Sequence, residues 1–82
     1  MTETVEGWAA RFAAYLGTNP PSDDELVALL DLAAVAAHAS VRTAAPVSCW
    51  LAARAGVGPA QALDLARRLA GEPEGGPTPP RP

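Results

Sequence analysis

The chain has 82 residues, a mass of 8.4 kDa and a net charge of −3. This length holds one small domain, and the single cysteine, Cys49, excludes an intramolecular disulfide. Nineteen of the forty apolar residues are alanine, which favours helices but fills a core poorly. The composition therefore predicts an all-α fold of thin, closely packed helices and excludes a sheet or a large ligand-enclosing core.

The first half of the chain predicts two helices. The first spans residues 3–16, where large apolar residues recur at helical spacing, and Gly17 followed by two prolines ends it. The second begins at Ser22, which forms a capping box with Glu25, and runs to about residue 39. We expect its buried stripe to consist of Leu26, Leu29, Leu30, Ala33 and Ala37.

The second half predicts two shorter helices. The third begins near Pro46, whose missing N–H is not needed in a first turn, and ends at Gly56. The fourth opens at Pro59 and closes at Gly71. We expect its inward residues to be Ala62, Leu65, Ala66 and Leu69.

Residues near the two ends of the chain predict where the domain stops and in which compartment the protein works. Five prolines and three glycines in the last twelve residues predict a disordered tail over 71–82, so the compact four-helix domain covers 1–70. The first residues lack the basic segment of a signal peptide, and no apolar run is long enough to span a membrane. With one free thiol, this pattern predicts a cytoplasmic protein.

The two halves of the domain differ in charge. Residues 1–40 carry a net charge of −5, and residues 41–70 carry +3. We interpret this difference as attraction between the halves within one bundle. The alternative is a basic patch that faces an anionic partner.

Catalysis and metal binding have little support. One histidine and one cysteine cannot supply the ligands of a structural zinc, and no phosphate-binding loop is present. Cys49 is interpreted as a small core residue, since it becomes a nucleophile only if the fold brings His38 beside it. We therefore expect a non-enzymatic protein with no catalytic residue, no metal and no cofactor.

Three sets of residues are candidates for binding. His38, Ser40, Arg42 and Thr43 lie where the second helix ends and could converge on an anion such as phosphate; the alternative is that His38 and Arg42 cap that helix. Trp8 and Trp50 are core anchors or interface residues, and the sequence leaves both possibilities open.

The third set belongs to a helix-turn-helix hypothesis. A tight corner at residues 51–59 is followed by a helix whose outer face carries Gln61, Asp64, Arg67 and Arg68. These residues are the alternative DNA contacts. The net negative charge argues against a nucleic-acid partner, because it removes the usual phosphate-binding footprint.

The chain also resembles a small actinobacterial helical family of unknown function. The likeness covers about residues 5–70 and is carried by three segments: Trp8 with Leu16-Gly17, residues 29–38, and residues 42–48. Members of that family occur alone or at the C-terminus of molybdenum-cofactor guanylyltransferases. The resemblance implies a non-catalytic accessory or protein-interaction role, with a molybdenum-cofactor protein as the partner.

Overall fold

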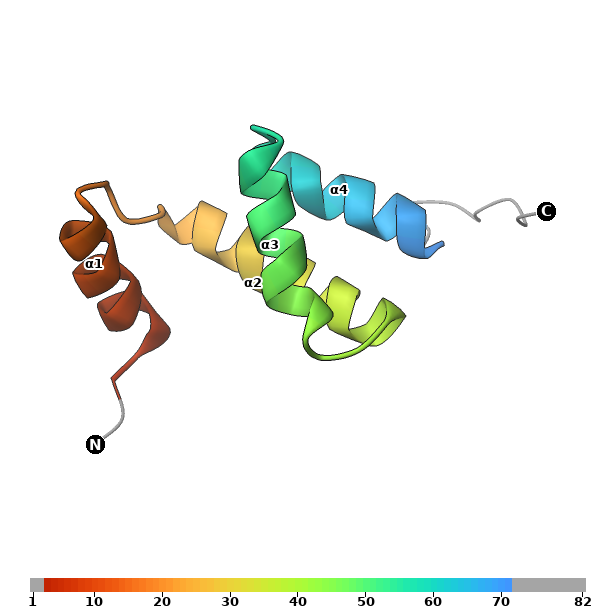
Figure 1. The fold of residues 1–82 in the computed structure, drawn as a ribbon, viewed down its shortest axis with the longest axis horizontal. Helices are drawn as coiled ribbons and strands as arrows, with labels where there is room; N and C mark the ends of the chain where they lie inside the picture. Colours follow the sequence, from red (N-terminus) through yellow and green to blue (C-terminus); the bar gives the residue numbers. More distant parts are fainter. Residues whose placement is uncertain (1–2, 72–82) are drawn as a thin grey trace.

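The computed structural model describes residues 3–71 and contains four helices (Figure 1). They are α1 (Val5–Leu16), α2 (Asp23–Ala39), α3 (Ala44–Arg54) and α4 (Pro59–Ala70). The predicted all-α fold of four helices is confirmed, and residues 3–71 contain no strand. The tail predicted over 71–82 lies, from residue 72 onward, outside the described residues.

Local signals in the sequence set the helix ends. The capping box of α2 is complete: the Glu25 amide donates to the Ser22 hydroxyl at 3.1 Å, and the Ser22 amide donates to the Glu25 carboxylate at 2.8 Å. Gly17 and Gly71 end α1 and α4 with φ of 81° and 82°, a left-handed conformation that favours glycine. These ends need no tertiary contact to form.

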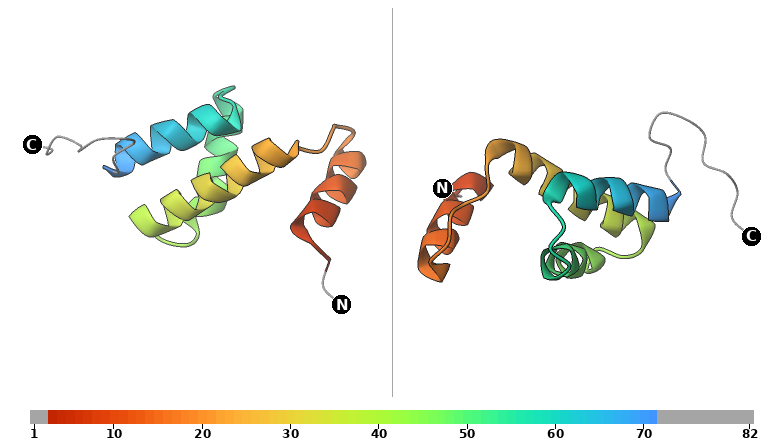
Figure 2. Two further views of the ribbon diagram at one scale, coloured as in Figure 1. Left: turned by 180° about the vertical axis from the view of Figure 1, so that it is seen from behind. Right: turned by 90° about the horizontal axis from the view of Figure 1, so that it is seen from above.

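The central element is α2, on which both α3 and α4 pack. Figures 1 and 2 show α2 and α4 side by side and running in the same direction, with α3 crossing them. The core cluster consists of Leu32 and Val35 from α2 with Ala62 and Leu63 from α4. Partly buried residues complete it: Cys49, Ala52, Val57 and Ala66.

The predicted buried stripe of α2 is wrong. The buried residues of α2 are Ala28, Leu32 and Val35, whereas Leu30 is 49% exposed. The other four members of the predicted stripe are only half-buried. Apolar residues surround α2 on nearly every side, so their spacing does not identify the face that meets α3 and α4.

The predicted set of inward residues on α4 is correct in part. Ala62 is buried and Ala66 half-buried, as expected, but Leu63 is buried in place of Leu65. Leu69 is 78% exposed. It lies in the last turns of α4, beside an open groove rather than against α2.

Helix α1 stands apart from the other three. It lies beside the start of α2 (Figure 1), its one buried residue is Ala13, and none of its contacts with another helix is extensive. The molecule measures 45 × 28 × 21 Å, with a radius of gyration of 14.2 Å. A compact domain of this length has a radius of gyration of about 11–12 Å, so α1 makes the molecule elongated.

Replacement of Ser22 by alanine tests the α2 cap. We expect Ser22→Ala to lower the free energy of unfolding by about 1 kcal/mol, because it leaves the Glu25 amide without its partner. Thr43→Ala is the matched control, since Thr43 occupies the same position on α3 without a side-chain cap bond. Urea unfolding followed by circular dichroism measures both. Equal losses of unfolding free energy in the two variants would contradict the assignment of Ser22 as the N-cap that stabilises α2.

Two leucines on α2 test which face is buried. Leu32 is 2% exposed and Leu30 is 49% exposed. We expect Leu32→Ala to cost about 2–5 kcal/mol, enough to unfold much of so small a domain. Leu30→Ala should cost less than about 1 kcal/mol, because little of its side chain leaves a packed site. If Leu30→Ala lowered the thermal stability more than Leu32→Ala, the buried stripe predicted from the sequence would be correct.

Candidate functional site

Helix α3 is apolar on two opposite faces. Its inner face packs on the core through Cys49 and Ala52. Its outer face carries Val47, Trp50 and Leu51, each more than half exposed, and no residue of α3 is fully buried. An apolar patch on a surface helix is a candidate site of contact with another molecule. We call Val47, Trp50, Leu51 and Arg54 the Trp50 face.

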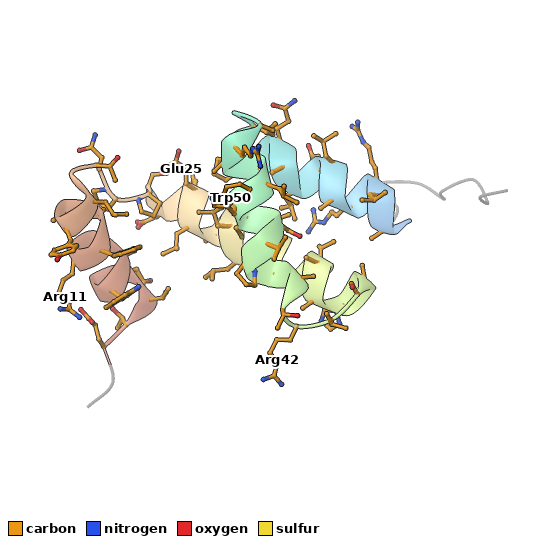
Figure 3. The ribbon with its side chains drawn as sticks, viewed as in Figure 1. Arg11, Glu25, Arg42 and Trp50 are labelled. Atoms are coloured by element: carbon orange, nitrogen blue, oxygen red, sulfur yellow. The ribbon has the colours of Figure 1, made fainter. Side chains whose placement is uncertain are left out.

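An arginine lies over the Trp50 ring. The Arg54 guanidinium carbon lies 5.0 Å from the ring centroid, within the range of a cation–π interaction. Because the two residues are four apart on one helix, this pairing is local and needs no other element. Trp50 is 58% exposed and Figure 3 labels it on α3. Tryptophan and arginine are the residue types most enriched at interface hot spots.

Helix α1 carries a second exposed aromatic surface. Trp8 and Phe12 stack with ring centroids 5.7 Å apart, and Arg11 lies 5.2 Å from the Trp8 centroid. Glu3 holds Arg11 through two hydrogen bonds of 2.9 Å and raises the pKa of its guanidinium. We call the exposed apolar residues of this helix the α1 stripe: Val5, Trp8, Phe12, Tyr15 and Leu16.

The structure places both tryptophans on the surface. Trp8 is 52% exposed, close to the value for Trp50, and neither belongs to the core cluster. Of the two possibilities left open by the sequence, these positions favour interface residues. Periodicity found both aromatic positions, but only the arrangement of the helices shows that nothing in residues 3–71 buries them.

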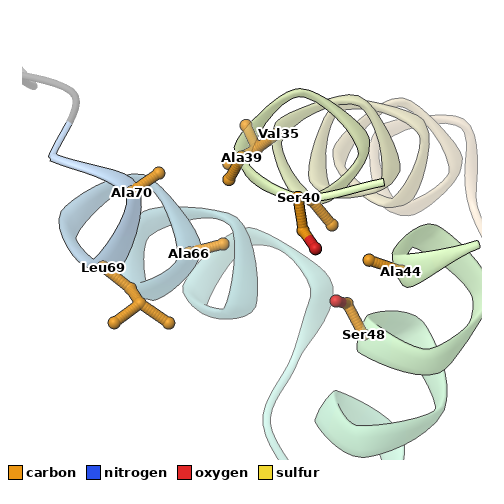
Figure 4. Close-up of a pocket in the computed structure, with 9 residues that line it drawn as sticks. Val35, Ala39, Ser40, Ala44, Ser48, Ala66, Leu69 and Ala70 are labelled. Atoms are coloured by element: carbon orange, nitrogen blue, oxygen red, sulfur yellow. The ribbon is translucent and has the colours of Figure 1, made fainter. Parts of the chain in front are cut away.

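A groove lies where α2, α3 and α4 meet (Figure 4). Its volume is ≈ 460 Å³, and five alanines and two serines line it together with Val35 and Leu69. The side chains of Ser40, the C-cap of α2, and of Ser48 on α3 face it. The sequence predicts a close helix contact at the alanines of residues 33–39. Two of these alanines, Ala36 and Ala39, line the groove.

The polar residues around the end of α2 do not form an anion-binding site in the part of the chain that the structure describes. His38, Ser40, Arg42 and Thr43 are all exposed, and in residues 3–71 none of their side chains makes a hydrogen bond or ion pair. Arg42 projects away from the helices (Figure 3). The capping alternative is not observed either, because within residues 3–71 neither His38 nor Arg42 donates a side-chain hydrogen bond to a carbonyl at the end of α2.

The residues of the DNA-binding hypothesis lie along α4. Gln61, Asp64 and Arg68 are exposed, and Arg67 is half-buried. A recognition helix contacts bases chiefly through its N-terminal residues. In α4 that half offers Gln61 and the acidic Asp64, while both arginines lie in the last turn. This arrangement gives DNA binding little support.

Cys49 does not have the environment of a nucleophile. Its side chain packs against the core cluster, and burial raises the pKa of the thiol. No hydrogen bond joins it to His38 in the described part of the chain. Within residues 3–71, no three His, Cys, Asp or Glu side chains are grouped so as to hold a metal ion. No helix there has the length and apolarity to cross a membrane.

Within residues 3–71, the fold and these surfaces define a small all-α protein with exposed aromatic faces on α1 and α3 and an open groove between α2, α3 and α4. The chain belongs to the family described as a domain of unknown function (DUF6457), which matches residues 1–76. No curated protein and no solved structure matches it. The predicted membership of a family of unknown function is thus confirmed.

Alkylation of Cys49 tests the environment of the thiol. Since burial raises its pKa, the reactive thiolate is scarcer at pH 8 than in an exposed cysteine. We expect iodoacetamide to label the folded chain several-fold more slowly than the same chain in urea, and the rate to rise with pH above 8. Mass spectrometry of quenched samples measures both rates. Faster labelling of the folded chain would show an activated cysteine and reopen the enzyme hypothesis.

Proposed function

We propose that this chain is a non-catalytic accessory module that binds another protein through the Trp50 face. The observation that carries the proposal is the outer side of α3, where Val47, Trp50 and Leu51 are more than half exposed on a helix that already packs its other side on the core. Covering three large apolar side chains supplies the free energy of binding.

The chemistry of the face suits a protein partner. Trp50 offers a large rigid apolar surface, and Arg54 keeps its charge beside the ring. A partner can therefore bury the ring and place a carboxylate near the guanidinium in the same contact. The core of an interface combines apolar burial with such charge-assisted bonds, whereas a small-molecule site is concave.

The partner class that we propose is a molybdenum-cofactor protein. Support comes from the resemblance to an actinobacterial family whose members occur alone or at the C-terminus of molybdenum-cofactor guanylyltransferases. The cytoplasmic location is part of the proposal, because such an enzyme and a reduced Cys49 both belong in a reducing compartment.

Binding to a purified partner tests this function. The probe is the molybdenum-cofactor guanylyltransferase encoded by the same host, titrated with the full chain in a calorimeter. We expect Trp50→Ala to weaken binding by about 30-fold, as for a central hot-spot residue. Val27→Ala is the matched control, since Val27 is an equally exposed apolar residue on α2.

The possible results of the titration distinguish an error in the proposed surface from an error in the proposed partner class. Binding that Trp50→Ala leaves unchanged would show that the Trp50 face is not the site. Absence of binding by the unaltered chain would exclude this partner class. A mobility-shift assay at low salt with host genomic fragments covers the rival function, and a specific shift would favour DNA binding over the accessory role.

A further inference from the structure

We propose that two copies of this chain form a two-fold dimer in which their α1 helices pair antiparallel through the α1 stripe. The molecule that covers the stripe is then the same stripe of a second chain. This inference goes beyond the proposed function, because the stripe shares no residue with the Trp50 face. The dimer and the contact with another protein use different helices.

The large residues of the stripe have the spacing of a helix-pairing seam. Val5, Trp8, Phe12 and Tyr15 follow one another at intervals of three, four and three positions, as the apolar positions of a coiled coil do. This order of intervals is the same when the helix is read from either end. Two copies can therefore pair antiparallel about a two-fold axis, with Val5 opposite Tyr15 and Trp8 opposite Phe12.

The stripe is not the side of α1 that its own chain covers. The covered side carries small residues, since Ala13 is buried and Ala9, one turn earlier, is half-buried. The large apolar residues of the stripe stay exposed. Figures 1 and 2 show α1 at one end of the molecule, apart from α3 and α4. The position of α1 thus leaves its seam open to a second molecule.

Local contacts order the stripe before any pairing. Thr4 and Gly17 cap the two ends of α1. Trp8 and Phe12 stack with ring centroids 5.7 Å apart, and the Arg11 guanidinium lies over the Trp8 ring. An ordered surface loses less conformational freedom on binding than a flexible one. These contacts therefore lower the cost of pairing two short helices.

The stripe has enough exposed area for a small interface. Its exposed fractions range from 44% for Val5 to 89% for Tyr15. A large aromatic side chain buries about 150–250 Å² when it is fully covered, so the five residues together expose roughly 600 Å². Pairing two stripes removes on the order of 1000 Å² from water, which is the size at which specific interfaces begin. We expect a weak dimer, with a micromolar Kd.

Charge favours the antiparallel pair over a parallel one. The first turn of α2 carries three acids, Asp23, Asp24 and Glu25, and it follows α1 after a short connector. Parallel pairing would bring these turns of the two chains together. Antiparallel pairing puts them at opposite ends of a 12-residue helix, which is about 18 Å long. Since salt screens charges beyond about 8 Å, the two acidic turns then repel each other little.

Sedimentation equilibrium on the full chain tests the dimer. We expect twice the monomer mass of 8.4 kDa at high concentration and dissociation on dilution. Phe12→Glu and Tyr15→Glu each place a carboxylate in the seam, and each should weaken dimerisation at least about tenfold. Tyr15 is so exposed that its replacement leaves the contacts within the chain intact. Val41→Glu is the matched control, since Val41 is an exposed residue beyond the far end of α2.

Disulfide cross-linking tests the antiparallel register. In the Cys49→Ala background, chains with Val5→Cys are mixed with chains with Tyr15→Cys and oxidised at a concentration where the unaltered chain is a dimer. We expect disulfide-linked heterodimers, because positions 5 and 15 lie opposite each other and a disulfide needs close Cα atoms. Either variant alone should form much less linked dimer. Circular dichroism checks that each variant keeps its helices.

Four results would overturn the proposal. One is a monomer at every concentration. The second is a dimer that both glutamate substitutions in the stripe leave intact, which would mean that another surface pairs. The third is loss of the dimer in Trp50→Ala, which would mean that the stripe docks on the Trp50 face of the second chain. The fourth is a disulfide formed mainly between like variants, which would mean that the helices are parallel.

The dimer and the proposed function can fail separately. The titration with the guanylyltransferase measures binding through Trp50, whereas sedimentation of the chain alone measures pairing through α1. A chain that dimerises but does not bind the enzyme keeps this inference and loses the proposed partner class. A monomeric chain that binds the enzyme through Trp50 does the reverse.

Discussion

The contact between α2 and α4 is the constraint on which the rest of this structure depends. Leu32 and Val35 meet Ala62 and Leu63 there, and α3 attaches to the cluster through Cys49 and Ala52. Two of the four central residues are small or β-branched, so this contact buries little apolar volume. A domain with so thin a core gains stability from any partner that covers its outer apolar faces.

The sequence predicts the helix ends well because the signals are local. Ser22 with Glu25, Pro59 and the glycines at 17 and 71 act within one turn of the chain, and the structure has a helix end at each. The buried faces are harder to predict. On α2, leucine, valine and alanine surround the axis, so the choice of Leu32 over Leu30 depends on where α3 and α4 lie.

For the candidate surfaces too, features within one helix are predictable from the sequence, and features that need several helices are not. Spacing identifies Trp8 and Trp50, and each pairs with an arginine three or four residues along its own helix. The groove is not predictable from spacing, because it requires three helices to meet. The polar residues from His38 to Thr43 lie close together in the sequence. At the end of a helix, however, successive side chains point in different directions.

The separation of α1 from the other helices also affects how the chain folds. Short connectors join α2, α3 and α4, so most contacts of that body are close in sequence, a topology that folds quickly. Assembly of the body does not wait for α1, whose contacts with the other helices are few. Substitutions along α1 therefore leave the folding of the body largely unaffected. The stability of the three-helix body therefore depends little on the sequence of α1.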